Sequence, residues 1–192
     1  MVGTTKTTKT TVKKSTKPAK AAQKPVAEPV SGKKKFWTIA LFIAIPVILG
    51  FVSSLISGNM AESYTGSFVN PPYAPPAWLF PVAWTILYIL MGLASYFIFA
   101  CKSKTKKERK YRCAALVLYF LQLAINFAWS PVFFGAGNYF LALIMLMVMW
   151  LMLLASMFII RERCMPAMWC LLPYALWCLF AMYLNIGVLL LN

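Results

Sequence analysis

The sequence contains no histidine and no aspartate, and its acidic residues are four glutamates. A serine or cysteine nucleophile normally needs an imidazole as its base, and the common zinc and calcium motifs need histidine or aspartate. A phosphate-binding G-x-x-x-x-G-K-S/T loop is also missing. These absences exclude conventional hydrolytic and acid–base catalysis, so we predict no conventional catalytic residue, no metal site and no resident cofactor.

Five long apolar stretches begin at residue 36, and they carry no charged residue except Arg112 at the start of the third. A helix needs roughly 20 apolar residues to cross the hydrocarbon core of a bilayer, and each stretch reaches that length. We predict spans at residues 36–57, 78–101, 111–134, 139–160 and 166–191. The predicted fold class is all-α, a polytopic membrane protein with a five-helix bundle in residues 36–192. Ion pumps and proton relays need ionisable residues at membrane depth, so those functions are disfavoured.

Lysine and arginine are confined to alternate connections between these spans. From residue 33 onwards they occur at 33–35, at 102–110 with Arg112 following directly, and at 161–163, whereas 58–77 and 135–138 contain none. Basic loops are retained on the cytoplasmic side of a membrane. The pattern therefore predicts that the N-terminus is cytoplasmic and the C-terminus lies outside.

Residues 1–35 contain ten lysines and no aromatic residue, with many threonines and prolines. Such a segment cannot bury enough apolar surface to offset the entropy of folding, so we predict a disordered cytoplasmic arm. An arm resting on anionic membrane lipid is favoured over a solvated tail. Nucleic-acid binding is the least favoured interpretation, because no aromatic side chain is available to stack on bases, and we predict no nucleic-acid partner.

Small residues are spaced for close helix contact in two predicted spans. Gly50, Ser54 and Gly58 recur at intervals of four in the first span, and Ala124 and Ala128 do so in the third. Helices in lipid approach one another through such small residues. Each ridge is compatible with internal packing or with a homodimer face.

Aromatic, amide and small side chains recur at helical spacing in three predicted spans, most of them in the outer half. They are Trp84 and Tyr88 in the second span, Gln122, Asn126 and Trp129 in the third, and Trp177, Ala181 and Asn185 in the fifth. The connection at 58–77 covers the same end, and its four prolines favour a defined lid. Aromatic stripes often serve packing alone. Their convergence with polar groups also fits a mostly apolar pocket for a flat ligand.

Three stretches of this sequence resemble the translocator protein / tryptophan-rich sensory protein (TspO/MBR) family. They are NPPYAPPAWLFPVAWTILYILMG at 70–92, LQLAINFAWSPVFFGAGN at 121–138 and LLPYALWCLFAMYLN at 171–185. The resemblance extends in weaker form over 36–192. It implies a five-helix membrane protein, often a homodimer, that binds a tetrapyrrole such as protoporphyrin IX or haem as a ligand.

The resemblance also implies which residues line the ligand pocket. They are Ser54, Trp84, Tyr88, Asn126, Trp129, Trp177 and Ala181. Among these, Trp84 and Trp177 match the tryptophans that the family associates with porphyrin binding and breakdown. Animal members also carry a sterol motif that ends in lysine or arginine, whereas Tyr183 is followed here by LNIGVLLLN. A sterol partner is therefore less favoured than a tetrapyrrole.

Four functions remain open at this point. The leading hypothesis is a receptor or sensor for a flat hydrophobic ligand. The alternatives are an enzyme that degrades porphyrin in light, with Trp84 and Trp177 as redox partners, a carrier of porphyrin or sterol, and a scaffold that recruits a partner through its arm. The basic cytoplasmic side favours a bacterial plasma membrane, and the family resemblance also allows a mitochondrial outer membrane.

Overall fold

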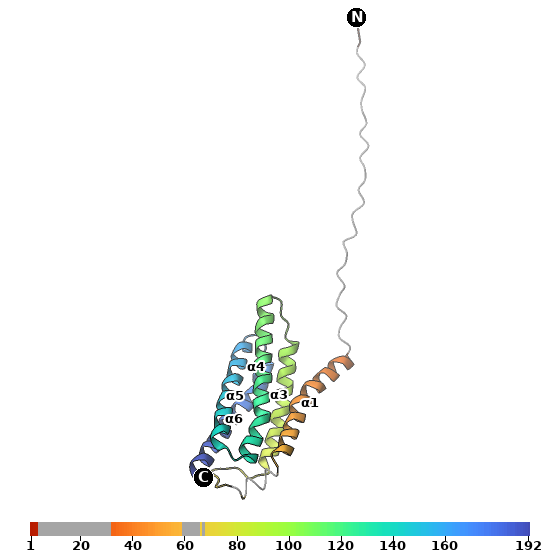
Figure 1. The fold of residues 1–192 in the computed structure, drawn as a ribbon. Coiled ribbons are helices and arrows are strands. Elements are labelled where there is room, and N and C mark those ends of the chain that lie inside the picture. The colour runs from red at the N-terminus through yellow and green to blue at the C-terminus, as the bar shows by residue number, and fades with distance from the viewer. Residues whose placement is uncertain (4–31, 59–65, 67) are drawn as a thin grey trace. The chain divides into compact units, whose positions relative to one another are not determined.

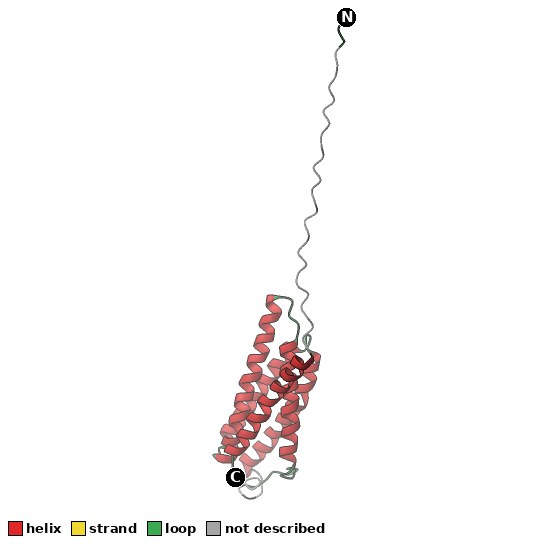
Figure 2. Cartoon of the chain, turned by 90° about the vertical axis from the view of Figure 1, so that its right-hand side faces the viewer, coloured by secondary structure: helices red, strands yellow, loops and turns green. Residues whose placement is uncertain are grey.

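Five membrane-length helices form the structure, a computed structural model that describes residues 1–3, 32–58, 66 and 68–192. They are α1 (Gly32–Ile56), α3 (Leu79–Ala100), α4 (Lys106–Ser130), α5 (Tyr139–Ile160) and α6 (Met165–Leu191) (Figure 1). A π-helical turn, η1 (Pro131–Gly135), continues α4. Helix is the only regular secondary structure in the described part of the chain (Figure 2). The predicted all-α five-helix membrane bundle is confirmed, and the chain is an integral multi-pass membrane protein.

Two helices begin four or five residues earlier than the apolar stretches that predicted them. The predicted arm lies mostly outside the described residues, but α1 starts at Gly32, so residues 32–35 are helical. Helix α4 starts at Lys106 instead of residue 111, because Thr105 and Glu108 form a capping box. The Thr105 hydroxyl accepts from the Glu108 N–H at 3.1 Å, and the Glu108 carboxylate accepts from the Thr105 N–H at 3.3 Å. The cap sets the helix start, whereas hydropathy marks only the part suited to lipid.

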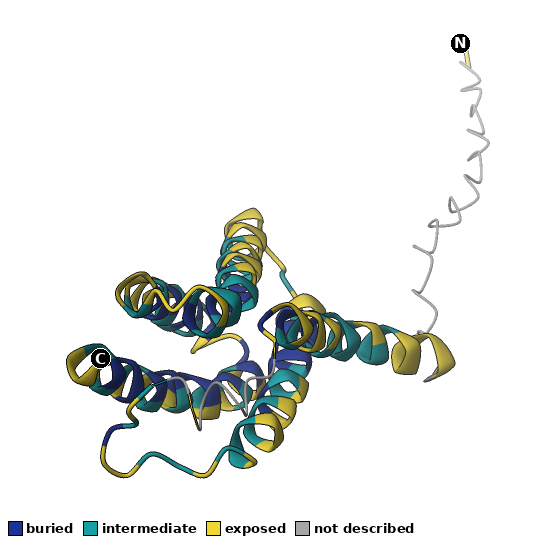
Figure 3. Cartoon of the chain, turned by 60° about the horizontal axis from the view of Figure 1, so that its bottom comes forward, coloured by how far each residue is buried: buried dark blue, intermediate teal, exposed yellow. Residues whose placement is uncertain are grey.

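The helices pack in a closed order within the unit Ser31–Asn192. Helix α1 packs on α3, α3 on α6, α6 on α5 and α5 on α4, and a lighter contact between α4 and α1 completes the order. Viewed from one end, buried positions turn towards neighbouring helices and exposed positions turn outwards (Figure 3). The outward positions carry large apolar side chains, as expected for a surface that faces lipid.

Helix α1 crosses α3 closely because α3 carries Gly92 at the crossing. A Cβ atom on Gly92 would overlap the backbone of Ile43 and press on the Phe42 carbonyl. That carbonyl lacks its usual helical donor, because Pro46 lies four residues later inside α1 and has no N–H. Farther along the same pair of helices, Gly50 leaves room for the Tyr88 ring. Gly50 of the first ridge therefore contributes to internal packing, while Ala124 of the second ridge is exposed.

Candidate functional site

A cavity of about 620 Å³ lies at the end of the bundle that carries the C-terminus. Its walls come from α1, α3, α4, η1 and α6, and the segment 68–77 contributes Phe68, Asn70, Pro71 and Ala77. The structure brings all seven predicted site residues into this one lining. They are Ser54, Trp84, Tyr88, Asn126, Trp129, Trp177 and Ala181.

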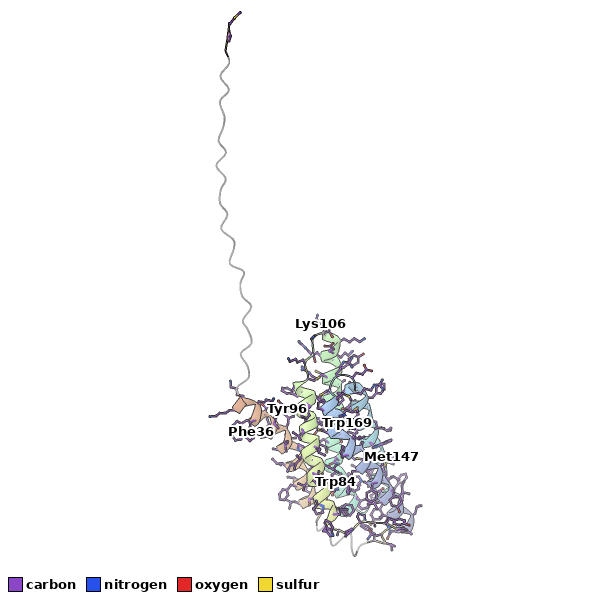
Figure 4. All side chains as sticks on the ribbon, turned by 180° about the vertical axis from the view of Figure 1, so that it is seen from behind. Phe36, Trp84, Tyr96, Lys106, Met147 and Trp169 are labelled. Atoms are coloured by element: carbon purple, nitrogen blue, oxygen red, sulfur yellow. The ribbon has the colours of Figure 1, made fainter. Side chains whose placement is uncertain are left out.

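One wall of the cavity is built on Trp84. Its indole stacks on the Tyr88 ring with centroids 5.4 Å apart and an angle of 28° between the planes. The Trp177 indole meets it edge to face at 6.4 Å and 80°. Trp84 lies in the half of the bundle opposite the end marked by Lys106 (Figure 4). Offset and edge-to-face contacts are the preferred aromatic geometries, so these rings hold one another in a fixed orientation.

A second aromatic wall lies around Trp129 at the end of α4. The Trp129 ring stacks on Phe133 of η1 with centroids 5.1 Å apart. Phe68, from the covering segment, meets the Phe133 ring edge to face at 5.6 Å. Trp129 was predicted from its helical spacing, whereas Phe68, Phe133 and Phe134 were not predicted. The FF pair stood in the stretch that carried the family resemblance, and no sequence signal distinguished Phe68.

The covering segment is fastened to the end of α6. The Asn192 side chain accepts from the Val69 N–H at 2.8 Å and donates to the Val69 carbonyl at 3.2 Å. The Tyr183 hydroxyl donates to the Pro72 carbonyl at 2.6 Å, and the Pro71 ring packs where Gly187 has no side chain. The described part of the expected lid is therefore attached to the bundle. Residues 59–65 and 67 of that loop lie outside the described residues.

The seam between α1 and α4 is closed by serine hydroxyls. Pro131 has no N–H to offer the Phe127 carbonyl four residues earlier, and Ser53 of α1 donates to that carbonyl instead, at 2.6 Å. One turn farther along α1, the Ser57 hydroxyl donates to the Ser130 hydroxyl at 2.9 Å. The π-helical turn begins at the same proline. The contact between α1 and α4 thus includes a backbone carbonyl that the proline leaves without its helical donor.

The cavity lining holds neutral polar groups and, among the described residues, no charged side chain. The Tyr88 hydroxyl donates to the Asn126 side-chain oxygen at 2.9 Å. The Trp129 indole N–H and both polar atoms of Asn185 are buried without a hydrogen-bond partner in the described part of the chain. Asn185 lies one turn beyond Ala181 on the predicted stripe and joins the lining. An uncharged cavity of this kind suits an apolar ligand that carries a few hydrogen-bonding groups.

Comparison with known proteins identifies the family. The model of the TspO/MBR family matches residues 42–191. The chain belongs to the TspO/MBR family. This membership confirms the resemblance inferred from the sequence, and the match lies within residues 36–192, over which that resemblance was drawn.

Relatives of this TspO/MBR protein occur in bacteria and in animals. It is 34% identical to the tryptophan-rich protein TspO of Chlorobaculum tepidum, over 83% of this chain and 98% of that protein. It is 33% identical to the tryptophan-rich sensory protein of Cereibacter sphaeroides, over 80% of this chain and 92% of that protein. The translocator protein of Bos taurus is 33% identical, over 78% of this chain and 87% of its own length.

The described residues of this TspO/MBR protein offer no cluster of His, Cys, Asp or Glu that could hold a metal ion. The cysteines at 101, 113, 164, 170 and 178 are all free thiols, and none of them lines the cavity within the described chain. The arrangement can therefore orient a bound molecule by stacking and hydrogen bonding.

Proposed function

We propose that this protein is a membrane receptor or sensor that binds a flat, mostly apolar ligand in the cavity, and that the ligand is a tetrapyrrole. The observation that carries this proposal is an uncharged cavity of about 620 Å³ with two aromatic walls. Pockets for small molecules typically occupy about 300–1,000 Å³ and are mostly apolar with a few orienting polar groups. The names of two relatives, tryptophan-rich sensory protein and translocator protein, agree with a ligand-responsive membrane protein.

The aromatic geometry suits a planar macrocycle. The Trp84 and Trp177 rings are nearly perpendicular, so a planar ligand can lie against the face of one and the edge of the other. Tyr88 and Asn126 lie in the same lining and add hydrogen-bonding groups at its side. These features support stacking as the main source of affinity, with the neutral polar groups fixing the orientation.

The lining favours a metal-free tetrapyrrole over haem. Haem iron in proteins is held by histidine, cysteine, methionine or tyrosine. Of these residue types, the described lining contains only Tyr88, and its hydroxyl is engaged with Asn126. We therefore propose protoporphyrin IX as the better match and haem as the weaker one.

The test is a titration of the purified full-length protein with protoporphyrin IX, followed by tryptophan fluorescence. Replacing Trp84 and Trp177 together by phenylalanine should weaken binding at least tenfold, because stacking area is lost from both faces. Trp169→Phe is the matched control, since Trp169 lies on α6 but is exposed. Equal affinities in the double variant and the control would contradict the proposal.

A second candidate function is the light-dependent breakdown of porphyrin with dioxygen as the oxidant. The observation that favours it is the direct contact between the Trp84 and Trp177 rings, which places two oxidisable indoles in one wall. Illuminated protein should then convert bound protoporphyrin IX, and the double phenylalanine variant should not. The same yield from the double variant under saturating porphyrin would leave binding as the function and exclude these indoles as reactants.

A further inference from the structure

A chain of hydrogen bonds runs from the cavity wall to the centre of the bundle. The Tyr88 hydroxyl donates to the Asn126 oxygen at 2.9 Å, and the Asn126 amide nitrogen donates to the Tyr174 hydroxyl at 3.1 Å. The Tyr174 hydroxyl donates in turn to the Gln122 side-chain oxygen at 2.9 Å. Tyr88 and Asn126 line the cavity, whereas Tyr174 and Gln122 lie behind that lining. This chain of hydrogen bonds therefore joins two groups that can contact a ligand to two groups that cannot.

Because these side chains are buried, the direction of the hydrogen-bond chain decides which of their polar atoms are paired. Asn126 is 3% exposed, and Gln122 and Tyr174 are fully buried. A buried polar group is costly unless it is paired, so each donor in the chain is directed at the next acceptor. Because the Tyr88 hydrogen points to Asn126, Tyr88 presents only oxygen lone pairs to the cavity. In this arrangement Tyr88 can accept a hydrogen bond from a ligand but cannot donate one.

The inner end of the chain is compatible with a second arrangement. The Gln122 amide nitrogen is buried without a hydrogen-bond partner among the described residues. A half-turn of the Gln122 and Asn126 amides exchanges their nitrogen and oxygen positions with little change in shape. Gln122 would then donate to Tyr174, Tyr174 to Asn126, and Asn126 to Tyr88. This reversed chain pairs the Gln122 nitrogen, places the Gln122 oxygen in the unpaired position instead, and frees the Tyr88 hydrogen for the cavity.

We propose that Gln122 and Tyr174 are positioning residues whose hydrogen-bond direction decides whether Tyr88 accepts from a ligand or donates to it. The inference rests on the proposed function, because it requires a ligand in the cavity. A ligand with an N–H group selects the observed direction, and a ligand with a carbonyl group selects the reversed one. The cavity thus recognises both donor and acceptor ligands without any charged residue.

In the observed direction the Tyr174 hydroxyl has a second possible acceptor. A mutation at Gln122 should therefore affect the two arrangements differently. The Tyr174 hydroxyl also lies 3.1 Å from the Met149 sulfur. If Gln122 is replaced by leucine, Tyr174 can still donate to that sulfur, and the observed direction survives. The reversed direction needs the Gln122 amide nitrogen as the donor to Tyr174, and the leucine variant has no such donor. Gln122→Leu should therefore impair recognition of acceptor ligands selectively.

Three flat tricyclic probes of nearly equal shape test this prediction. Carbazole carries an N–H donor, fluorenone a carbonyl acceptor, and fluorene neither group. In the full-length protein, carbazole and fluorenone should both bind more tightly than fluorene. In Gln122→Leu, fluorenone affinity should fall roughly threefold to tenfold, the range of one net hydrogen bond, and carbazole affinity should stay unchanged. Tyr119→Phe is the matched control, because Tyr119 is a fully buried tyrosine of α4 outside this chain of contacts.

A spectroscopic measurement separates direction from general loss of structure. The infrared carbonyl stretch of bound fluorenone should shift to lower frequency when Tyr88 donates to it, and Gln122→Leu should abolish that shift while Tyr119→Phe retains it. An equal fall in carbazole and fluorenone affinity, or fluorenone binding no better than fluorene in the unmodified protein, would overturn the inference. Failure of all three probes and of protoporphyrin IX to bind would instead overturn the proposed function.

Discussion

The two halves of the bundle differ in how their helices meet. In the half that carries the basic connections, the contacts are made by small and aliphatic side chains that are almost completely buried, including Ala94, Ala115, Leu153, Ala167 and Leu171. In the half that carries the C-terminus, tryptophan and phenylalanine rings surround the cavity. Lipid gives helices little hydrophobic reason to associate, so close packing depends on small residues. In the half with the basic connections, small side chains let the helix backbones approach closely. In the half with the C-terminus, aromatic rings that pack against one another surround an open cavity.

The largest expected effect comes from making the same substitution in both halves. Leu171→Ala should lower the free energy of unfolding by about 2–4 kcal/mol, because it creates a void where the side chain is fully buried. Leu184→Ala, on the same helix but in the cavity lining, should cost about half as much, since it enlarges an existing space. Unfolding by SDS, followed by circular dichroism, measures both variants. Equal losses would show that the cavity half is packed as tightly as the other.

A smaller effect is expected from Gly92→Ala at the crossing of α1 and α3. The added methyl group meets the backbone of Ile43, so the helices must separate, at a cost of about 1–3 kcal/mol. Gly135→Ala is the control, because a Cβ atom there meets nothing nearby. The same SDS unfolding experiment applies. A neutral Gly92→Ala would mean that α1 does not depend on this close approach.

The serine hydrogen bond between α1 and α4 should contribute about 1 kcal/mol to the free energy of unfolding. Ser53→Ala removes the donor to the Phe127 carbonyl, and a lost hydrogen bond of this kind costs about 0.5–1.5 kcal/mol. The loss of unfolding free energy caused by Ser53→Ala should be smaller in a Pro131→Ala background, because alanine supplies a backbone N–H in the same region. A double-mutant cycle measured by SDS unfolding tests this coupling. Purely additive effects would show that Ser53 does not compensate for the proline.

The smallest effect is expected at the covering segment. Asn192→Ala removes both side-chain hydrogen bonds to Val69. Hydrogen exchange at the Val69 amide should then become roughly fivefold faster, which corresponds to about 1 kcal/mol of lost protection. Asn138→Ala is the control, because Asn138 caps α5 at the Leu141 N–H at the same end of the bundle. Unchanged exchange at Val69 after Asn192→Ala would show that other contacts hold the segment down.

The helices were predictable because each is fixed by local features. Apolar length located α5 to the residue, at 139–160, and α6 to within one residue. Helical spacing placed Trp84 with Tyr88, and Trp177 with Ala181, on single faces. The start of α4 was missed by five residues, since the capping box at Thr105 adds charged turns that hydropathy does not detect.

The site was only partly predictable, because its remaining members come from distant segments. Phe68 reaches the Phe133 ring across 65 positions of sequence, and Asn192 binds Val69 across 123. Neither pair has a periodic signal. The π-helical turn that begins at Pro131 also escaped prediction, because a proline near a helix end has several structural outcomes that the local sequence does not distinguish.

The sequence by itself determined how many helices cross the membrane, where most of them end, and which faces carry indoles and amides. Bilayer thickness and the 3.6-residue period act within one segment, so local residues suffice. Only the tertiary structure decided which faces meet, that α1 closes on α4 through Ser53, and that Tyr88, Asn126, Tyr174 and Gln122 form one chain. These helices are apolar on nearly every side, so hydropathy cannot orient them. Steric approach and the pairing of buried polar groups do so instead.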